Sequence, residues 1–284
     1  MTDAAQSLPL AERERALLFS RWRYYLASIP TLLLRIRSWP AVLAIFAGLP
    51  VKRPVTIVLQ DGSRFRVRGR MDVWIIKETC LDRDYERGAV SVEDGWTVVD
   101  IGAGSGDFAI SVARRSARSR VFAFEPLPES FGLLLENLRL NGLSNVTPFP
   151  EAIAGRQGEL LLYTKTGLEG QHRTAQTATP ETGGALRVPS ISLEAAFDRS
   201  DITVCDLLKI DCEGGEYDIL FGASAEALSR VRHIAMEFHD GITAHSHEDL
   251  VPYLESHGFR VRTRPNPAHA NLGFLFAANR RLEA

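Results

Sequence analysis

The sequence from 98 to 106 reads Val98-Val99-Asp100-Ile101-Gly102-Ala103-Gly104-Ser105-Gly106, and the segment from 122 to 126 reads Phe122-Ala123-Phe124-Glu125-Pro126. Each segment contains an apolar run that ends at an acid, and a glycine-rich turn and an amphipathic stretch separate the two runs. This order predicts a strand, a turn, a helix and a second strand. Because glycine has no Cβ, the backbone can turn sharply there and a ligand can touch it. The unit therefore predicts a nucleoside-binding site.

The spacing of the glycines indicates which nucleoside binds. A dinucleotide fingerprint, G-x-G-x-x-G, places a pyrophosphate on the helix N-terminus. Here the third glycine comes one residue early and Asp107 occupies its place, where a carboxylate would repel phosphate. A cofactor without phosphates, S-adenosylmethionine (SAM), fits this pattern, although a tight turn without a ligand is the alternative. Glu125 is expected to bind the ribose hydroxyls. The other expected cofactor contacts at this unit are Asp100, Gly102, Ala103, Gly104, Gly106 and Pro126.

Composition is that of an ordinary globular protein. The 284 residues are 45% hydrophobic and 24% charged, with a net charge of −2. The balanced charge gives no general attraction to nucleic acid, so no nucleic-acid partner is expected. Three cysteines in apolar surroundings argue against a disulfide framework, and no signal peptide is recognisable, so a cytoplasmic location is expected.

Residues 1–53 are interpreted as an N-terminal helical extension. They carry eight Lys or Arg and three acids, interleaved with aromatic and aliphatic residues, and their uncharged runs are too short to span a bilayer. Pro30, Pro40 and Pro50 are expected to divide the segment into short helices. Two interpretations of residues 11–50 stay open. They form either a cap packed on the catalytic domain or a basic, aromatic helical hairpin that lies on the inner face of a membrane or grips an acidic or lipid-linked substrate.

Residues 54–90 are expected to form a β-hairpin and a lead-in helix. Alternating residues over 55–60 and 63–68 flank Asp61-Gly62, which predicts a two-residue hairpin turn, and residues 71–85 are expected to be helical. Residues 91–284 alternate strand-like and helical segments, with a polar loop expected over 167–187. Such alternation predicts an α/β, doubly wound sheet that binds its ligand above the carboxyl ends of the strands.

Several of these segments resemble the FkbM family of SAM-dependent methyltransferases. The resemblance extends over residues 55 to 240 and rests on Asp100 to Gly106, Phe124-Glu125-Pro126, Asn137 to Asn141, the lead-in from Asp72 to Tyr85, and above all Leu208-Lys209-Ile210-Asp211-Cys212-Glu213-Gly214-Gly215-Glu216. Two departures are Gly104-Ser105 in place of Asn-Ile and Cys212 in place of Val. The resemblance implies a class I methyltransferase Rossmann-like fold, with a seven-stranded sheet whose last strand is antiparallel. It also implies O-methylation of a sugar, polyketide or similar metabolite, with Glu78 and Tyr85 reaching the cofactor.

Four residues follow two buried strands and are the catalytic candidates. Asp211 and Glu213 follow one strand, and Glu237 and His239 end the next, so all four should meet at one edge of the sheet. Transfer to an alcohol needs alignment and a base. His239 is the expected general base because its ordinary pKa is near neutrality. Asp211 and Glu213 are expected to hold the methionine end of the cofactor or to orient the acceptor.

Two further assignments rest on position in the chain. Ala152 and Glu151 follow the third strand and are expected near the adenine, or else simply end that strand. The four catalytic candidates could instead bind Mg²⁺ or Mn²⁺. Their spacing matches no metal template, so no metal site is expected.

Two functions of different classes follow. The chain is expected to methylate a hydroxyl of a small molecule, a sugar, a glycolipid or another glycan. The alternative is a SAM-binding accessory or scaffold of a membrane-associated biosynthetic complex, without turnover. Converging charges at the predicted site favour the enzyme, because a scaffold has no need of them.

Overall fold

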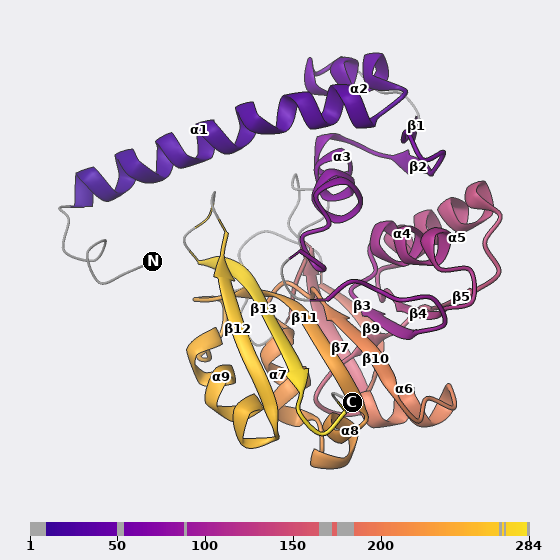
Figure 1. The fold of residues 1–284 in the computed structure, drawn as a ribbon, viewed down its shortest axis with the longest axis vertical. Helices are drawn as coiled ribbons and strands as arrows, with labels where there is room; N and C mark the ends of the chain where they lie inside the picture. Colours follow the sequence, from indigo (N-terminus) through magenta and orange to yellow (C-terminus); the bar gives the residue numbers. More distant parts are fainter. Residues whose placement is uncertain are drawn as a thin grey trace.

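A seven-stranded sheet forms the centre of the protein in the computed structural model, which describes residues 10–49, 54–87, 90–164, 172–174, 185–266, 269 and 271–282 (Figure 1). In spatial order its strands are β12 (Phe259–Pro265), β13 (Leu272–Asn279), β11 (Val231–His239), β10 (Cys205–Ile210), β3 (Thr97–Ile101), β4 (Arg120–Phe124) and β5 (Val146–Phe149). The last strand, β13, is antiparallel to both of its neighbours, whereas β11, β10, β3, β4 and β5 pair in parallel. This confirms the predicted class I methyltransferase arrangement.

Helices cover both faces of this sheet, because adjacent residues of a strand point to opposite sides. Val98 belongs to one buried cluster and Val99 to the other, and Leu207 and Leu208 divide in the same way. The first face packs against α3 (Arg70–Ile76), α4 (Asp107–Arg115) and α5 (Pro128–Asn141). The second packs against α6 (Leu193–Arg199), α7 (Glu216–Gly222), α8 (Ala225–Ser229) and α9 (His247–Ser256). The doubly wound prediction is therefore confirmed.

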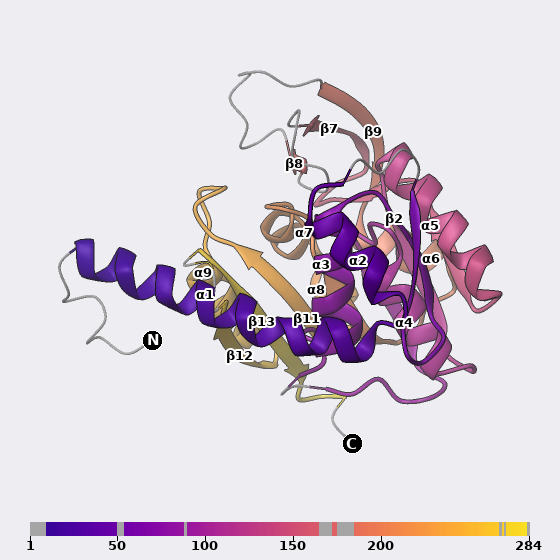
Figure 2. The ribbon, with the colours of Figure 1, turned by 90° about the horizontal axis from the view of Figure 1, so that it is seen from above.

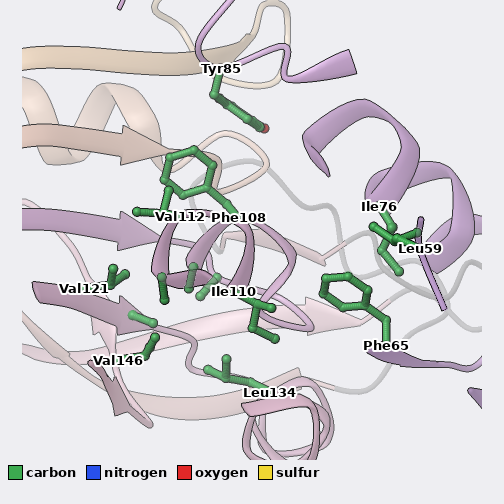
Figure 3. Close-up of a cluster of buried hydrophobic side chains, with 14 of the residues drawn as sticks. Leu59, Phe65, Ile76, Tyr85, Phe108, Ile110, Val112, Val121, Leu134 and Val146 are labelled. Atoms are coloured by element: carbon green, nitrogen blue, oxygen red, sulfur yellow. The ribbon is translucent and has the colours of Figure 1, made fainter. Parts of the chain in front are cut away.

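The N-terminal segments share the core of the first face. They comprise α1 (Leu10–Arg35), α2 (Trp39–Phe46), a hairpin of β1 (Val55–Val58) and β2 (Arg64–Val67), and, after α3, a π-helical turn, η2 (Lys77–Asp82). Figure 3 shows Leu59, Phe65 and Ile76 in one buried cluster with Ile110 of α4. Leu32 of α1 is buried in the same cluster. Figures 1 and 2 show the rest of α1 running past the sheet on the outside of the molecule.

Two local predictions for this region were wrong. Pro30 lies inside α1 and does not end it. Leu32 and Ile36, which follow Pro30, are buried in the core, and this packing outweighs the lost backbone hydrogen bond. The hairpin turn is longer than two residues, because the ladder ends at the Val58–Arg64 pair and Leu59 forms an isolated bridge with Ile36 instead. Pro50 lies outside the described residues.

A second sheet was not predicted. It has four strands in the order β6 (Ala152–Ile153), β9 (Ala185–Ile191), β7 (Gly158–Thr164) and β8 (His172–Thr174). The last residues of the expected 167–187 loop therefore begin a strand, and residues 172–174 form another; residues 167–171 and 175–184 lie outside the described residues. The predicted helix over 71–85 is also shorter than expected and ends in the η2 turn.

Candidate active site

A cavity of about 740 Å³ opens at the carboxyl edge of the central sheet. This is where parallel α/β sheets bind ligands, and the volume suits a cofactor together with an acceptor. In the order of the strands, the turns after β3 and β4 lie toward one end of the cavity, and the ends of the neighbouring strands β10 and β11 lie toward the other. Residues of the N-terminal helices and of the second sheet also line it. Predicted residues that line the cavity are Glu78, Gly102, Gly104, Glu125, Pro126, Ala152, Asp211, Glu213, Glu237 and His239.

The glycine turn after β3 has a shape that only glycine allows. Gly102 has a φ of +71°, and a Cβ there would lie 1.8 Å from the backbone oxygen of Asp211. Gly104 has a φ of +54° and open space around it. Both line the cavity, so a ligand can approach bare backbone here. The turn is a cradle for a flat or ribose-like group.

Glu125 ends β4 and reaches back to the glycine turn. Its Oε2 accepts a hydrogen bond from Gly104 N at 2.8 Å, and its Oε1 accepts one from Leu127 N at 2.9 Å. Burial raises the pKa of Glu125 to about 7, although these two backbone donors favour its charged form. The carboxylate is thus held rigidly beside the cradle, where each oxygen has a further lone pair for a ligand hydroxyl.

Ala152 and Glu151 differ in where their side chains lie. Ala152 lines the cavity together with apolar residues of the second sheet, Ile153, Leu160 and Leu162. These form an apolar wall suited to a flat ring. Glu151 does not line the cavity, because its carboxylate pairs with Arg199 Nη2 at 2.6 Å.

Asp100 also lies behind the cavity wall. It is fully buried and forms an ion pair with Lys209, whose Nζ is 3.0 Å from Asp100 Oδ1. The same ammonium donates a hydrogen bond to the backbone oxygen of Gly102 at 2.9 Å. Lys209 lines the cavity and was not among the predicted site residues. A lysine within the apolar run of residues 207–210 was the available signal, because a buried lysine needs a partner.

The opposite end of the cavity is acidic. Asp211 Oδ2 accepts a hydrogen bond from the Tyr85 hydroxyl at 2.7 Å, and Glu237 Oε2 lies 3.4 Å from the same hydroxyl. Burial and the charge of Asp211 raise the pKa of Glu237 well above its usual range. Burial and the same two acids also raise the pKa of Tyr85, so the phenol remains a proton donor. Tyr85 does not itself line the cavity, but it holds two acids that do.

His239 is surrounded by carboxylates, and this changes its expected role. Its Nδ1 lies 2.8 Å from Glu216 Oε1, and its Nε2 lies 3.6 Å from Glu213 Oε2. Burial alone would lower the pKa of His239, but the charges of Glu216, Glu213 and Glu237 raise it to about 10. The imidazole is therefore cationic at neutral pH. A cationic imidazole cannot accept a proton, so the geometry does not favour His239 as the general base.

Glu216 fixes the loop that carries two of the acids. It is fully buried in the first turn of α7, and its carboxylate accepts hydrogen bonds from Cys212 N at 3.1 Å and Gly214 N at 2.8 Å. The loop between β10 and α7 is thus tied to the helix start. Glu213 in this loop has a φ of +51°, a conformation that costs energy for a residue with a Cβ.

Glu78 joins the cavity from the lead-in segment. Its Oε1 accepts hydrogen bonds from the Tyr24 hydroxyl at 2.5 Å and from Trp74 Nε1 at 2.8 Å. Burial raises its pKa, against these two donors. Tyr24 belongs to α1, so the N-terminal extension helps to position a cavity residue, a connection that the sequence did not reveal.

The expected cofactor residues Ala103 and Gly106 do not line the cavity. Gly106 instead packs under α5, where a Cβ would lie 2.5 Å from Leu134 Cδ1. Ala103 is buried in the core of the first face.

One cluster in the described part of the chain could hold a metal ion. Asp211, Glu237 and His239 each offer an atom within 4.8 Å of the others. Ligation would require neutral His239, whereas its three acidic neighbours favour the imidazolium. A metal ion bound there would therefore have to displace a proton from His239.

Comparison with known proteins agrees with this geometry. The sequence is 28% identical over 237 residues to the 31-O-demethyl-FK506 methyltransferase FkbM of Streptomyces tacrolimicus, covering 73% of this chain and 89% of that protein. It is 26% identical over 211 residues to the hexuronic acid methyltransferase AglP of Haloferax volcanii, covering 73% and 82%. It is 27% identical over 227 residues to the AMB antimetabolite synthetase AmbE of Pseudomonas aeruginosa; that match covers 67% of this chain but spans only 11% of AmbE.

The chain also resembles proteins of known structure. The crystal structure of methyltransferase FkbM from Methylobacillus flagellatus is 17% identical, with a TM-score of 0.49, and the match covers 67% of this chain and 45% of that one. The family described as the methyltransferase FkbM domain matches residues 100–261, which is more than half of the sequence and includes both ends of the cavity. The chain therefore belongs to the FkbM family of methyltransferases.

Proposed function

We propose that the protein transfers a methyl group from SAM to a hydroxyl oxygen of a small molecule or glycan. The observation that carries the proposal is the division of one cavity into two ends. A backbone cradle with a fixed carboxylate lies at one end, and a cluster of acids at the other. When bound, SAM supplies a methyl group on a positively charged sulfur.

The cradle end fits SAM. Gly102 and Gly104 offer bare backbone to the nucleoside, and Glu125 accepts hydrogen bonds from the ribose hydroxyls. The apolar wall that includes Ala152 and Ile153 contacts the adenine. Asp211 and Glu213 provide negative charge for the cationic methionine end. Bare backbone, an apolar wall and the Glu125 carboxylate thus suit the nucleoside, and acids suit the positively charged end of the cofactor.

The acidic end suits an alcohol acceptor. A hydroxyl must lose its proton as the oxygen attacks, so a base must lie beside it. Glu237 is the proposed base, because its side chain lines the cavity beside Asp211 and its ionised carboxylate can accept the proton of the hydroxyl. Asp211, held by Tyr85, orients the acceptor hydroxyl. The imidazolium of His239 stabilises the negative charges that converge on it.

Product chemistry tests the proposal directly. The purified chain is incubated with SAM carrying a labelled methyl group and with fractionated small molecules and glycans. We expect a labelled product whose mass increases by one methyl group in place of one hydrogen, with the NMR shift of a methyl ether. Glu226→Gln, a change of an exposed glutamate on α8, is the matched control for Glu237→Gln and should transfer normally. A methylated nitrogen or carbon would reject oxygen transfer. Tight SAM binding with no labelled product in any fraction would favour the scaffold alternative.

A further inference from the structure

The outer side of α1 and α2 carries most of the exposed large hydrophobic side chains in the described part of the protein. Ten of twelve such residues lie between positions 22 and 49. They are Trp22, Tyr25, Leu26, Ile29, Leu33, Leu34, Trp39, Leu43, Phe46 and Leu49. We call these ten residues the apolar face. A concentration of this kind on a soluble domain marks an interaction surface.

The apolar face is separate from the core contacts of the same helices. Trp22, Leu26, Ile29 and Leu33 follow one another at intervals of four, three and four residues, which places them along one stripe of α1. Leu32 and Ile36 point to the core instead. Figures 1 and 2 show α1 at the periphery of the molecule, with α2 beside its C-terminal end. The helix pair is therefore apolar both toward the domain and away from it.

The charges within this segment have one sign. Residues 22–49 contain Arg23, Arg35 and Arg37 and no acid. A twofold contact between two copies of this face would bring the same arginines together without acids to pair with them. An anionic lipid surface would accept both the apolar side chains and the arginines. Among the described helices, none combines the length and the apolar character of a membrane span. The proposed contact places α1 along the lipid surface.

The apolar face continues into the opening of the cavity. Tyr25 and Phe46 are exposed members of the face and also line the cavity. Arg70 lies beside them, is exposed, and makes no hydrogen bond or ion pair with any residue in the described part of the chain. A guanidinium that no described residue engages is suited, at such an opening, to a phosphate group. A path from the membrane to the active site would thus pass the apolar face first, then Arg70, and then the acidic end of the cavity.

We infer that the apolar face docks on an anionic lipid bilayer and that the cavity receives its acceptor from the membrane surface. The acceptor class is then a hydroxyl-bearing head group on a lipid-anchored carrier, with Arg70 at its phosphate. This second part depends on the proposed methyl transfer. The docking itself does not depend on that function.

Co-sedimentation with vesicles tests the docking without cofactor or acceptor. The full chain is mixed with vesicles of phosphatidylcholine alone or with phosphatidylglycerol added. We expect sedimentation with the anionic vesicles that falls as salt is raised. Leu26→Ser combined with Leu43→Ser should weaken binding by about tenfold or more, since each leucine contributes apolar burial. Arg70→Gln should weaken binding by about fivefold, the effect of one basic residue at a lipid surface.

Leu135→Ser is the matched control, because Leu135 is also an exposed leucine, 37% accessible, but lies on α5. It should bind vesicles as the unchanged protein does. Tryptophan fluorescence adds a second measurement. Lipids with brominated chains should quench Trp22 and Trp39 and leave the buried Trp96 unaffected. Circular dichroism verifies that each variant is folded.

Three results would overturn the inference. The unchanged protein would remain in solution with both kinds of vesicle, or the double leucine variant would sediment as well as the control. Alternatively, light scattering would show a dimer that the double variant abolishes while vesicle binding is absent, which would make the face a contact between two copies. Loss of methyl transfer with vesicle binding intact would reject only the proposed function.

Discussion

The two ends of the cavity depend on different parts of the residues that form them. The cradle end depends on backbone: Gly102 and Gly104 have positive φ angles, and Glu125 is held by two backbone amides. The acidic end depends on side chains that set one another's charge, with Glu237 and His239 as the main examples. Shape thus determines one end and mutual electrostatics the other. Substitutions at the cradle end should act by changing its shape, and substitutions at the acidic end should act by changing the protonation of its side chains.

The largest effect is expected at Glu237. Glu237→Gln keeps the shape of the side chain but removes the proton acceptor, so kcat should fall by about 10²- to 10⁴-fold. SAM affinity, measured by calorimetry, should stay within about twofold because the cradle is untouched. A kcat close to that of the unchanged protein would mean that another group accepts the proton.

At the cradle end, Gly102→Ala should destabilise the protein by about 3–5 kcal/mol. Its Cβ would lie 1.8 Å from the backbone oxygen of Asp211, which cannot move without displacing the acidic end. Gly104→Ala is the matched control, since the atom nearest to its Cβ would be Asp107 Oδ1, 3.9 Å away. Gly104→Ala should lower the free energy of unfolding by only about 1–2 kcal/mol, because the alanine must adopt the left-handed conformation. Urea denaturation measures both, and equal losses would contradict the role given to Asp211.

The charge of His239 should appear in the pH dependence of stability. Its pKa in the folded protein is raised to about 10, so the stabilisation is complete below the unfolded pKa near 6.5. It is lost as the pH rises through about 10. We expect His239→Gln to be less stable than the unchanged protein at pH 6, by on the order of a few kcal/mol. The difference should shrink steadily toward pH 10 in thermal melts, and a difference independent of pH would refute an imidazolium.

A smaller effect is expected at Glu125. Because burial raises its pKa to about 7, SAM should bind more tightly as the pH rises through 7 and the carboxylate forms. Glu125→Gln should weaken binding by about tenfold at pH 8, the effect of losing a charged hydrogen bond. The same substitution should also remove the increase in SAM affinity as the pH rises through 7. Isothermal titration at several pH values measures both, and unchanged affinity would remove the assignment to the ribose.

The cradle could be predicted from sequence because its determinants are local. The strands β3 and β4 lie where the sequence predicts them, and the glycines lie within the one turn that follows β3. The position of the acidic end could be predicted from sequence, but the protonation of its side chains could not. The protonation of His239 depends on Glu216, 23 positions away, which only the packing of α7 brings within 2.8 Å. The short strand β8 and the continuation of α1 through Pro30 also escaped prediction, because tertiary contacts override local signals there.

Lys209 links the two ends of the cavity. Its ammonium lies 3.0 Å from Asp100 on β3 and 4.0 Å from Asp211 at the acidic end, and it also binds the oxygen of Gly102. One buried positive charge thus offsets acids on both sides of the cavity. A relative that acquires a new acceptor by neutralising Asp211 would leave this charge in excess beside the cofactor. Neutralising Asp211 is therefore expected to alter the electrostatics of both ends of the cavity.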